Sequence, residues 1–96
     1  MEKFVWDLVR ALMTMADAYP HDFDLSVWYR QFHVTVRVAQ KLNHKIAIHI
    51  HVVDVESKSS YIVENDDVGT WTKSLMILRP SSVTSVVERT LEFCNK

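Results

Sequence analysis

Two stretches of alternating apolar and polar residues, joined by a short polar segment, constrain this chain more than any other feature. Residues 32–38 read FHVTVRV and residues 45–56 read KIAIHIHVVDVE. Alternation at a period of two is typical of a β-strand with one buried face, and the many β-branched residues favour the same conformation. Residues 39–44 are too few for a crossover connection, so the two strands are expected to pair as an antiparallel β-hairpin.

The turn at residues 42–44 sets the register of this hairpin. If Lys41 faces Lys45, every side chain keeps its face, and Val36 pairs with Ile50 in the core. Arg37 then lies opposite His49, and Thr35 lies opposite His51. The other face of the hairpin is predicted to carry five polar residues: His33, Thr35, Arg37, His49 and His51.

Helices are predicted at both ends of the chain. In residues 2–18 the polar side chains recur at steps of three and four, and Pro20 follows the segment. After Pro80, the apolar residues of a second segment share one helical face that includes Cys94, with Ser81 or Ser82 as its N-cap.

Further strands are predicted between the hairpin and the second helix. Residues 60–64 (SYIVE) read as a third strand, residues 65–72 (NDDVGTWT) as a loop, and residues 74–79 (SLMILR) as a short buried strand. Residues 24–29 extend the first strand, with a bulge at Arg30 and Gln31. The order α-β-β-β-(β)-α predicts one α+β domain over residues 1–96, with a three- to four-stranded antiparallel sheet and two helices packed on one face.

The composition excludes several classes of function. Gly69 is the single glycine in 96 residues, so the glycine-rich phosphate loop, the dinucleotide-binding fingerprint and the nucleophile elbow cannot be built. The single cysteine, Cys94, cannot form an internal disulfide, which favours a reducing compartment. No segment resembles a signal peptide or a membrane span, and we expect a cytoplasmic protein without membrane association.

The first predicted helix has more apolar surface than one core-facing stripe requires. Its apolar residues cover roughly 220° of the helical circumference, whereas a surface helix needs little more than about 100°. Trp6, Val9 and Met13 lie on the flank of this arc. We expect these three residues to bind a partner, most simply a second copy in a homodimer. The alternative is that the flank packs against the C-terminal helix.

The polar face of the hairpin allows other interpretations. Solvated side chains on a half-exposed sheet would produce the same pattern. His49 and His51, followed by Glu56, resemble the first metal-binding motif of the cupins over about eight residues, but the second cupin motif is absent. His33-Val-Thr35 resembles half of the paired signature of two-histidine phosphoesterases, which would imply phosphate chemistry.

Nucleic-acid binding is a further alternative. The order of elements resembles that of the double-stranded-RNA-binding domain, but the basic run that this family has at its second helix is missing. Residues 30–58 hold five Lys or Arg and two Asp or Glu, so the hairpin is the basic part of a chain with a net charge of −1.

No catalytic residue can be named from the sequence, because no nucleophile is accompanied by a base and an orienting group. We therefore expect a non-enzymatic interaction module without a cofactor or a metal site, acting as a small intracellular regulator, inhibitor or accessory subunit through a protein partner or through itself. The alternative is a nucleic-acid-binding or metal-binding module that uses the histidine face of the hairpin.

Overall fold

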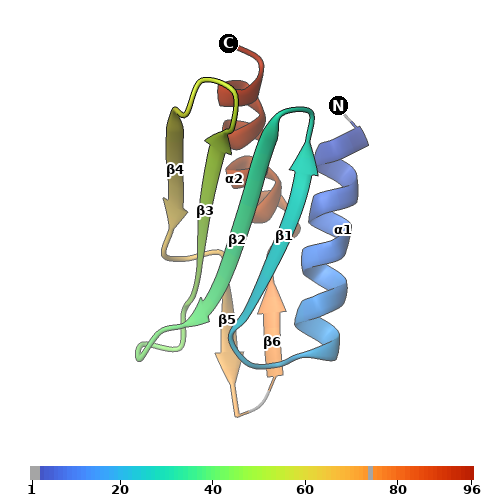
Figure 1. Cartoon of the computed structure of the whole chain (residues 1–96). Coiled ribbons are helices and arrows are strands. Elements are labelled where there is room, and N and C mark those ends of the chain that lie inside the picture. Colours follow the sequence, from blue (N-terminus) through green and yellow to red (C-terminus); the bar gives the residue numbers. More distant parts are fainter. Residues whose placement is uncertain (1–2, 74) are drawn as a thin grey trace.

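The computed structural model describes residues 3–73 and 75–96 as two helices and six strands (Figure 1). Residue 2 of the predicted first helix and residue 74 of the predicted last strand lie outside the described residues. The elements in chain order are α1 (Lys3–Ala18), β1 (Phe23–Tyr29), β2 (Phe32–Gln40), β3 (Ile46–Asp54), β4 (Ser60–Asn65), β5 (Gly69–Thr72), β6 (Leu75–Leu78) and α2 (Pro80–Cys94).

Four strands form an antiparallel sheet in the order β1-β2-β3-β4, so each strand pairs with its neighbour in the chain. The β2–β3 register agrees with the one predicted, since Val36 pairs with Ile50 and Arg37 lies opposite His49. The backbone N–H of Lys41 donates to the carbonyl of Lys45 at 2.8 Å and closes this hairpin. The predicted α+β class with an antiparallel sheet and two helices is confirmed.

The first part of the sheet differs from the prediction. Residues 24–29 do not extend the following strand through a bulge. They belong to β1, a separate strand that turns at Arg30 and pairs with β2 from Phe23 opposite Val38 to Tyr29 opposite Phe32. Arg30 adopts a positive φ of 56°, which lets the chain reverse within two residues.

The segment after β4 also differs from the prediction. Residues 65–72 are not a loop throughout, because Gly69–Thr72 forms β5 and pairs with β6 in a two-stranded sheet. β6 is not fully buried: Met76 and Leu78 face the core, whereas Leu75 and Ile77 are exposed. The two-stranded sheet lies at the lower end of the larger sheet in Figure 1. Lys45, just before β3, forms an isolated bridge there with Thr70 of β5.

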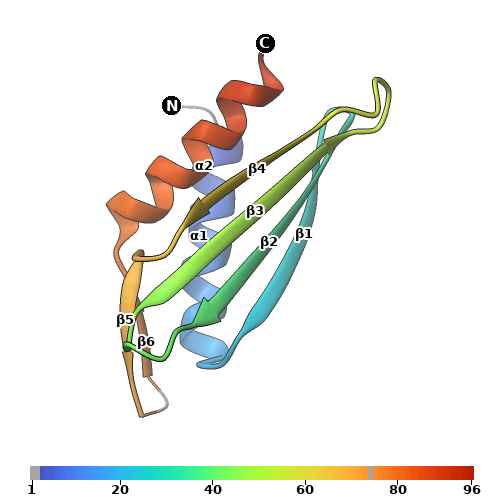
Figure 2. The same ribbon diagram turned by 90° about the vertical axis from the view of Figure 1, so that its left-hand side faces the viewer.

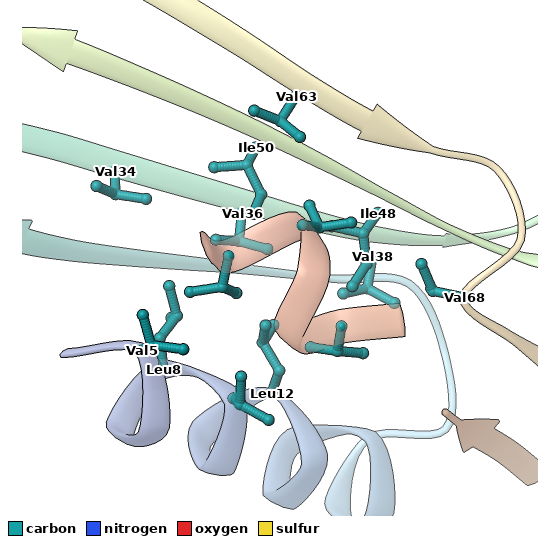
Figure 3. Packing of buried hydrophobic residues seen from close by; sticks show 14 of the residues in the cluster. Val5, Leu8, Leu12, Val34, Val36, Val38, Ile48, Ile50, Val63 and Val68 are labelled. Atoms are coloured by element: carbon teal, nitrogen blue, oxygen red, sulfur yellow. The ribbon is translucent and has the colours of Figure 1, made fainter. Parts of the chain in front are cut away.

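Both helices cover the same face of the four-stranded sheet (Figure 2). The core between the layers contains Leu12 of α1 and the sheet residues Val36 and Ile50 (Figure 3). Val87 of α2 belongs to the same core, and all four residues have at most 1% exposure. Burial of these aliphatic side chains supplies the main driving force for the fold. Cys94 is buried at the end of α2, as its apolar helical face predicted.

The start of α2 is organised differently from the prediction. Arg79 occupies the N-cap position with an extended backbone, no side chain caps the helix there, and Pro80 takes the first helical position. Proline suits that position because the first N–H of a helix has no intrahelical acceptor. Neither Ser81 nor Ser82 is therefore the N-cap. Among the described residues, no helix combines the length and the apolar character needed to cross a membrane.

Candidate functional site: the outer face of the sheet

The four-stranded sheet has one face that neither helix covers, which we call the outer face (Figure 2). Side chains alternate along each strand, so every second residue of β1 to β4 points to this face. The five residues predicted for the polar face of the hairpin all lie on it, half-buried or exposed. The flanking strands add six more residues to it: Asp24, Ser26 and Trp28 from β1, and Ser60, Ile62 and Glu64 from β4.

One row of ionisable residues crosses the outer face from edge to edge. Asp24, Arg37, His49 and Glu64 lie opposite one another on the four successive strands. Arg37 donates to both carboxylate oxygens of Asp24, from Nε at 2.9 Å and from a terminal nitrogen at 3.3 Å. The hydrogen bonds and the charge of Asp24 raise the pKa of Arg37, so this guanidinium is a permanent cation. On the other side, His49 Nε2 lies 3.5 Å from a carboxylate oxygen of Glu64.

These acidic neighbours change the electrostatics that the hairpin alone predicted. Arg37 belongs to an ion pair with Asp24, and two further basic residues of the hairpin region bond to residues outside the outer face. Arg30 donates to Asn95 at 3.1 Å, and Lys45 bonds to Asp67 at 3.1 Å. The outer face is therefore a surface of mixed and largely compensated charge, rather than a basic one.

The histidines of the outer face lie in different surroundings. The ring of His33 packs against the indole of Trp28 with 4.8 Å between the ring centroids. His51 lies between Thr35 on β2 and Ile62 on β4. Across residues 3–73 and 75–96, no three or more His, Cys, Asp or Glu residues are grouped so that they could hold a metal ion.

Apolar side chains gather toward the end of the outer face that lies away from β5 and β6. Trp28 is 62% exposed and Ile62 is 52% exposed, and the half-buried Val53 lies between their strands. The pattern of the central hairpin does not identify Trp28 and Ile62, because both lie on the flanking strands. The alternation in residues 24–29 (DLSVWY) and 60–64 (SYIVE) was the signal that could have placed both side chains on this face.

The three residues predicted to bind a partner from the first helix have separate environments. Val9 is 6% exposed and belongs to the core, while Met13 is partly buried against it. Trp6 is 51% exposed. Since α1 packs directly against α2, most of the flank is used within the chain, and only Trp6 of the three presents a large exposed area.

Comparisons of the chain with protein-family models, with curated proteins and with solved structures find no match.

Proposed function

We propose that this chain is a protein-interaction module, of the kind used by small regulators, inhibitors and accessory subunits, and that it binds its partner through the outer face of the sheet. The observation that carries the proposal is the exposure of Trp28 on a regular sheet face that no element of the described chain covers. A tryptophan on a rigid strand can bury a large area on binding with little loss of side-chain entropy, and tryptophan is enriched among the residues that dominate binding energy.

The row of ionisable residues, Asp24, Arg37, His49 and Glu64, supports a protein partner over a nucleic acid. Nucleic-acid binding draws most of its affinity from lysine and arginine that neutralise phosphates. Arg37 is already held by Asp24, and Glu64 at the other edge would repel a phosphate backbone. A partner that combines an apolar side chain for Trp28 with neutral polar groups for the central rows matches the surface better.

Affinity capture with matched variants tests this proposal. The bait proteins are the unchanged chain, Trp28→Ser, and Leu75→Ser as the control, because Leu75 is similarly exposed at 58% but lies on β6, outside the outer face. A partner recovered by the unchanged chain and by Leu75→Ser, and lost with Trp28→Ser, supports the proposal. A partner that all three baits recover equally places binding elsewhere on the molecule and contradicts it.

A further inference from the structure

The two lateral edges of the four-stranded sheet are exposed to different degrees. Beside β1 lies α1 (Figure 1), and the rings of Phe4 and Tyr29 pack in a tilted arrangement with 4.5 Å between their centroids. On the opposite side, β4 is the last strand of the sheet and Figure 1 shows no element beyond it. β4 pairs regularly with β3 from Ser60 to Asn65 and contains no proline or lysine, the residues with which edge strands are commonly blocked.

The backbone of β4 directs alternate peptide groups away from the sheet. The N–H of Asp54 donates to the carbonyl of Ser59, and the carbonyl of Ile46 accepts from the N–H of Val68. The even-numbered residues of β3 therefore direct their backbone hydrogen bonds toward β4. On β4, the residues opposite these even-numbered residues are Tyr61, Val63 and Asn65. The N–H and carbonyl groups of the alternate residues therefore point outward from the edge: Ser60, Ile62 and Glu64.

We propose that β4 pairs antiparallel with β4 of a second copy of this chain, with Ile62 opposite Ile62 at the two-fold axis. Ser60 of each copy then lies opposite Glu64 of the other, and the outward groups of all three residues are used in roughly six backbone hydrogen bonds. The exposed side chains of the two Ile62 residues bury each other. The result is one continuous eight-stranded sheet.

Charge at the two ends of β4 favours a second copy as the occupant, and the length of β4 favours this register. Lys58 lies in the turn before β4 with a φ of 63°, and Asp66 directly follows the strand; both are exposed. Antiparallel pairing centred on Ile62 brings the turn that carries Lys58 of each copy beside the strand end that carries Asp66 of the other. Centring on Glu64 would oppose two carboxylates directly, and centring on Ser60 would bring Glu64 beside the turn that carries Glu56, both of which are unfavourable. Centring on Tyr61 or Val63 would leave one of the three outward residues without a partner inside β4.

This dimer adds to the proposed function without depending on it. A two-fold axis perpendicular to the sheet keeps both outer faces on the same side, and all four helices on the other. The dimer therefore presents two copies of Trp28 on one surface and can hold a two-fold symmetric partner at two points at once. Trp28 lies on β1, at the edge away from the two-fold axis, so replacing it tests partner binding without altering self-association.

Sedimentation equilibrium over a micromolar concentration series tests the dimer. The unchanged chain should approach twice the monomer mass of 11.2 kDa. Ile62→Lys places two positive charges together at the axis and should give the monomer mass, whereas Leu75→Lys, at a similarly exposed position on β6, should remain dimeric. Lys58→Glu should raise the dissociation constant of the dimer about tenfold, because two ion pairs become repulsive.

Exchanging the charges at positions 58 and 66 tests whether the two strands pair in the proposed register. Asp66→Lys alone should weaken the dimer, and combining it with Lys58→Glu should restore the dissociation constant, since the opposed charges are again unlike. Recovery of the dissociation constant in the double variant tests the proposed dimer even if Ile62→Lys fails to fold. A monomeric unchanged chain overturns the proposal, as does a dimer that Ile62→Lys and the two charge variants leave unaffected.

Discussion

Gly69 and Ile77 approach each other so closely across the β5–β6 hairpin that Gly69 has no room for a side chain. A Cβ atom on Gly69 would overlap the carbonyl oxygen of Ile77 and would lie 2.9 Å from Cα of Leu78. Gly69 does not have a positive φ, so its role is close backbone approach rather than a turn. The single glycine of the chain thus permits the two short strands to pair.

Replacing this glycine should weaken the fold. Gly69→Ala forces the two strands apart and should lower the free energy of unfolding by about 2 kcal/mol, the usual cost of overpacking a tight site. Thr70→Ala, at an exposed position of the same strand, should change it by less than about 0.5 kcal/mol. Urea denaturation followed by circular dichroism measures both values, and equal stability of the two variants would show that β5 can move away without cost.

The contrast between the central hairpin and β5–β6 shows what the sequence can predict. In residues 32–38 and 45–56, burial of one face enforces a period of two over many residues, so strands, register and the five polar outer residues follow from the pattern. β5 has four residues and begins with a glycine, which reads as a turn signal. Its position depends on distant contacts, such as the hydrogen bond from Trp71 Nε1 to the carbonyl of Lys41 at 2.9 Å.

For the candidate site, the sequence predicts the residues of the central hairpin but not those of the flanking strands. The register of β2 and β3 placed Arg37 opposite His49, but the acidic residues Asp24 and Glu64 come from β1 and β4. Their alignment depends on the turns before and after the hairpin, and the sequence at Arg30 and Gln31 predicts a bulge where the structure has the first of these turns. The hairpin alone therefore appeared basic, while the complete sheet compensates its charge.

The flank of α1 gives a prediction that separates core from surface. Val9→Glu buries a charge without a partner in the core and should lower the free energy of unfolding by more than about 3 kcal/mol. Trp6→Glu, on the same helix at 51% exposure, should leave a cooperative melt close to that of the unchanged chain. Thermal unfolding monitored by circular dichroism compares them, and a stable Val9→Glu variant would mean that Val9 is not part of the core.

Asp67 predicts how stability depends on acid pH. Its carboxylate accepts hydrogen bonds from Arg79 at 2.8 Å and from Lys45 at 3.1 Å, and these bonds lower its pKa below the ordinary value. An acid with a lowered pKa in the folded state stabilises the fold above its unfolded pKa of about 4, and this contribution is lost as the pH falls further. Asp67→Asn should therefore be less stable than the unchanged chain at pH 7, with a difference that shrinks below about pH 4.

Urea denaturation at a series of pH values from neutral to acid measures this difference, with Asp17→Asn as the control. Asp17 is exposed on α1, and its replacement should change the free energy of unfolding by less than about 0.5 kcal/mol. A gap between Asp67→Asn and the unchanged chain that stays constant with pH would show that the carboxylate charge is not the stabilising group.

Cys94 should be protected from alkylation in the folded chain. Burial raises the pKa of its thiol from 9.0 to about 11, which lowers the reactive thiolate fraction near neutral pH roughly 100-fold. Iodoacetamide labelling followed by mass spectrometry should be slow in buffer and fast in concentrated urea. Equal rates in the two conditions would indicate that the end of α2 is open.

Site-specific photocrosslinking in the native cell is the most direct measurement of the proposed binding surface. A photoreactive phenylalanine derivative replaces Trp28 in one version of the chain and Leu75 in another, so that both probes are aromatic and exposed. If the outer face binds a protein, position 28 gives a discrete adduct with one partner, and position 75 does not. The same adducts from both positions, or none from position 28, would contradict binding through this face.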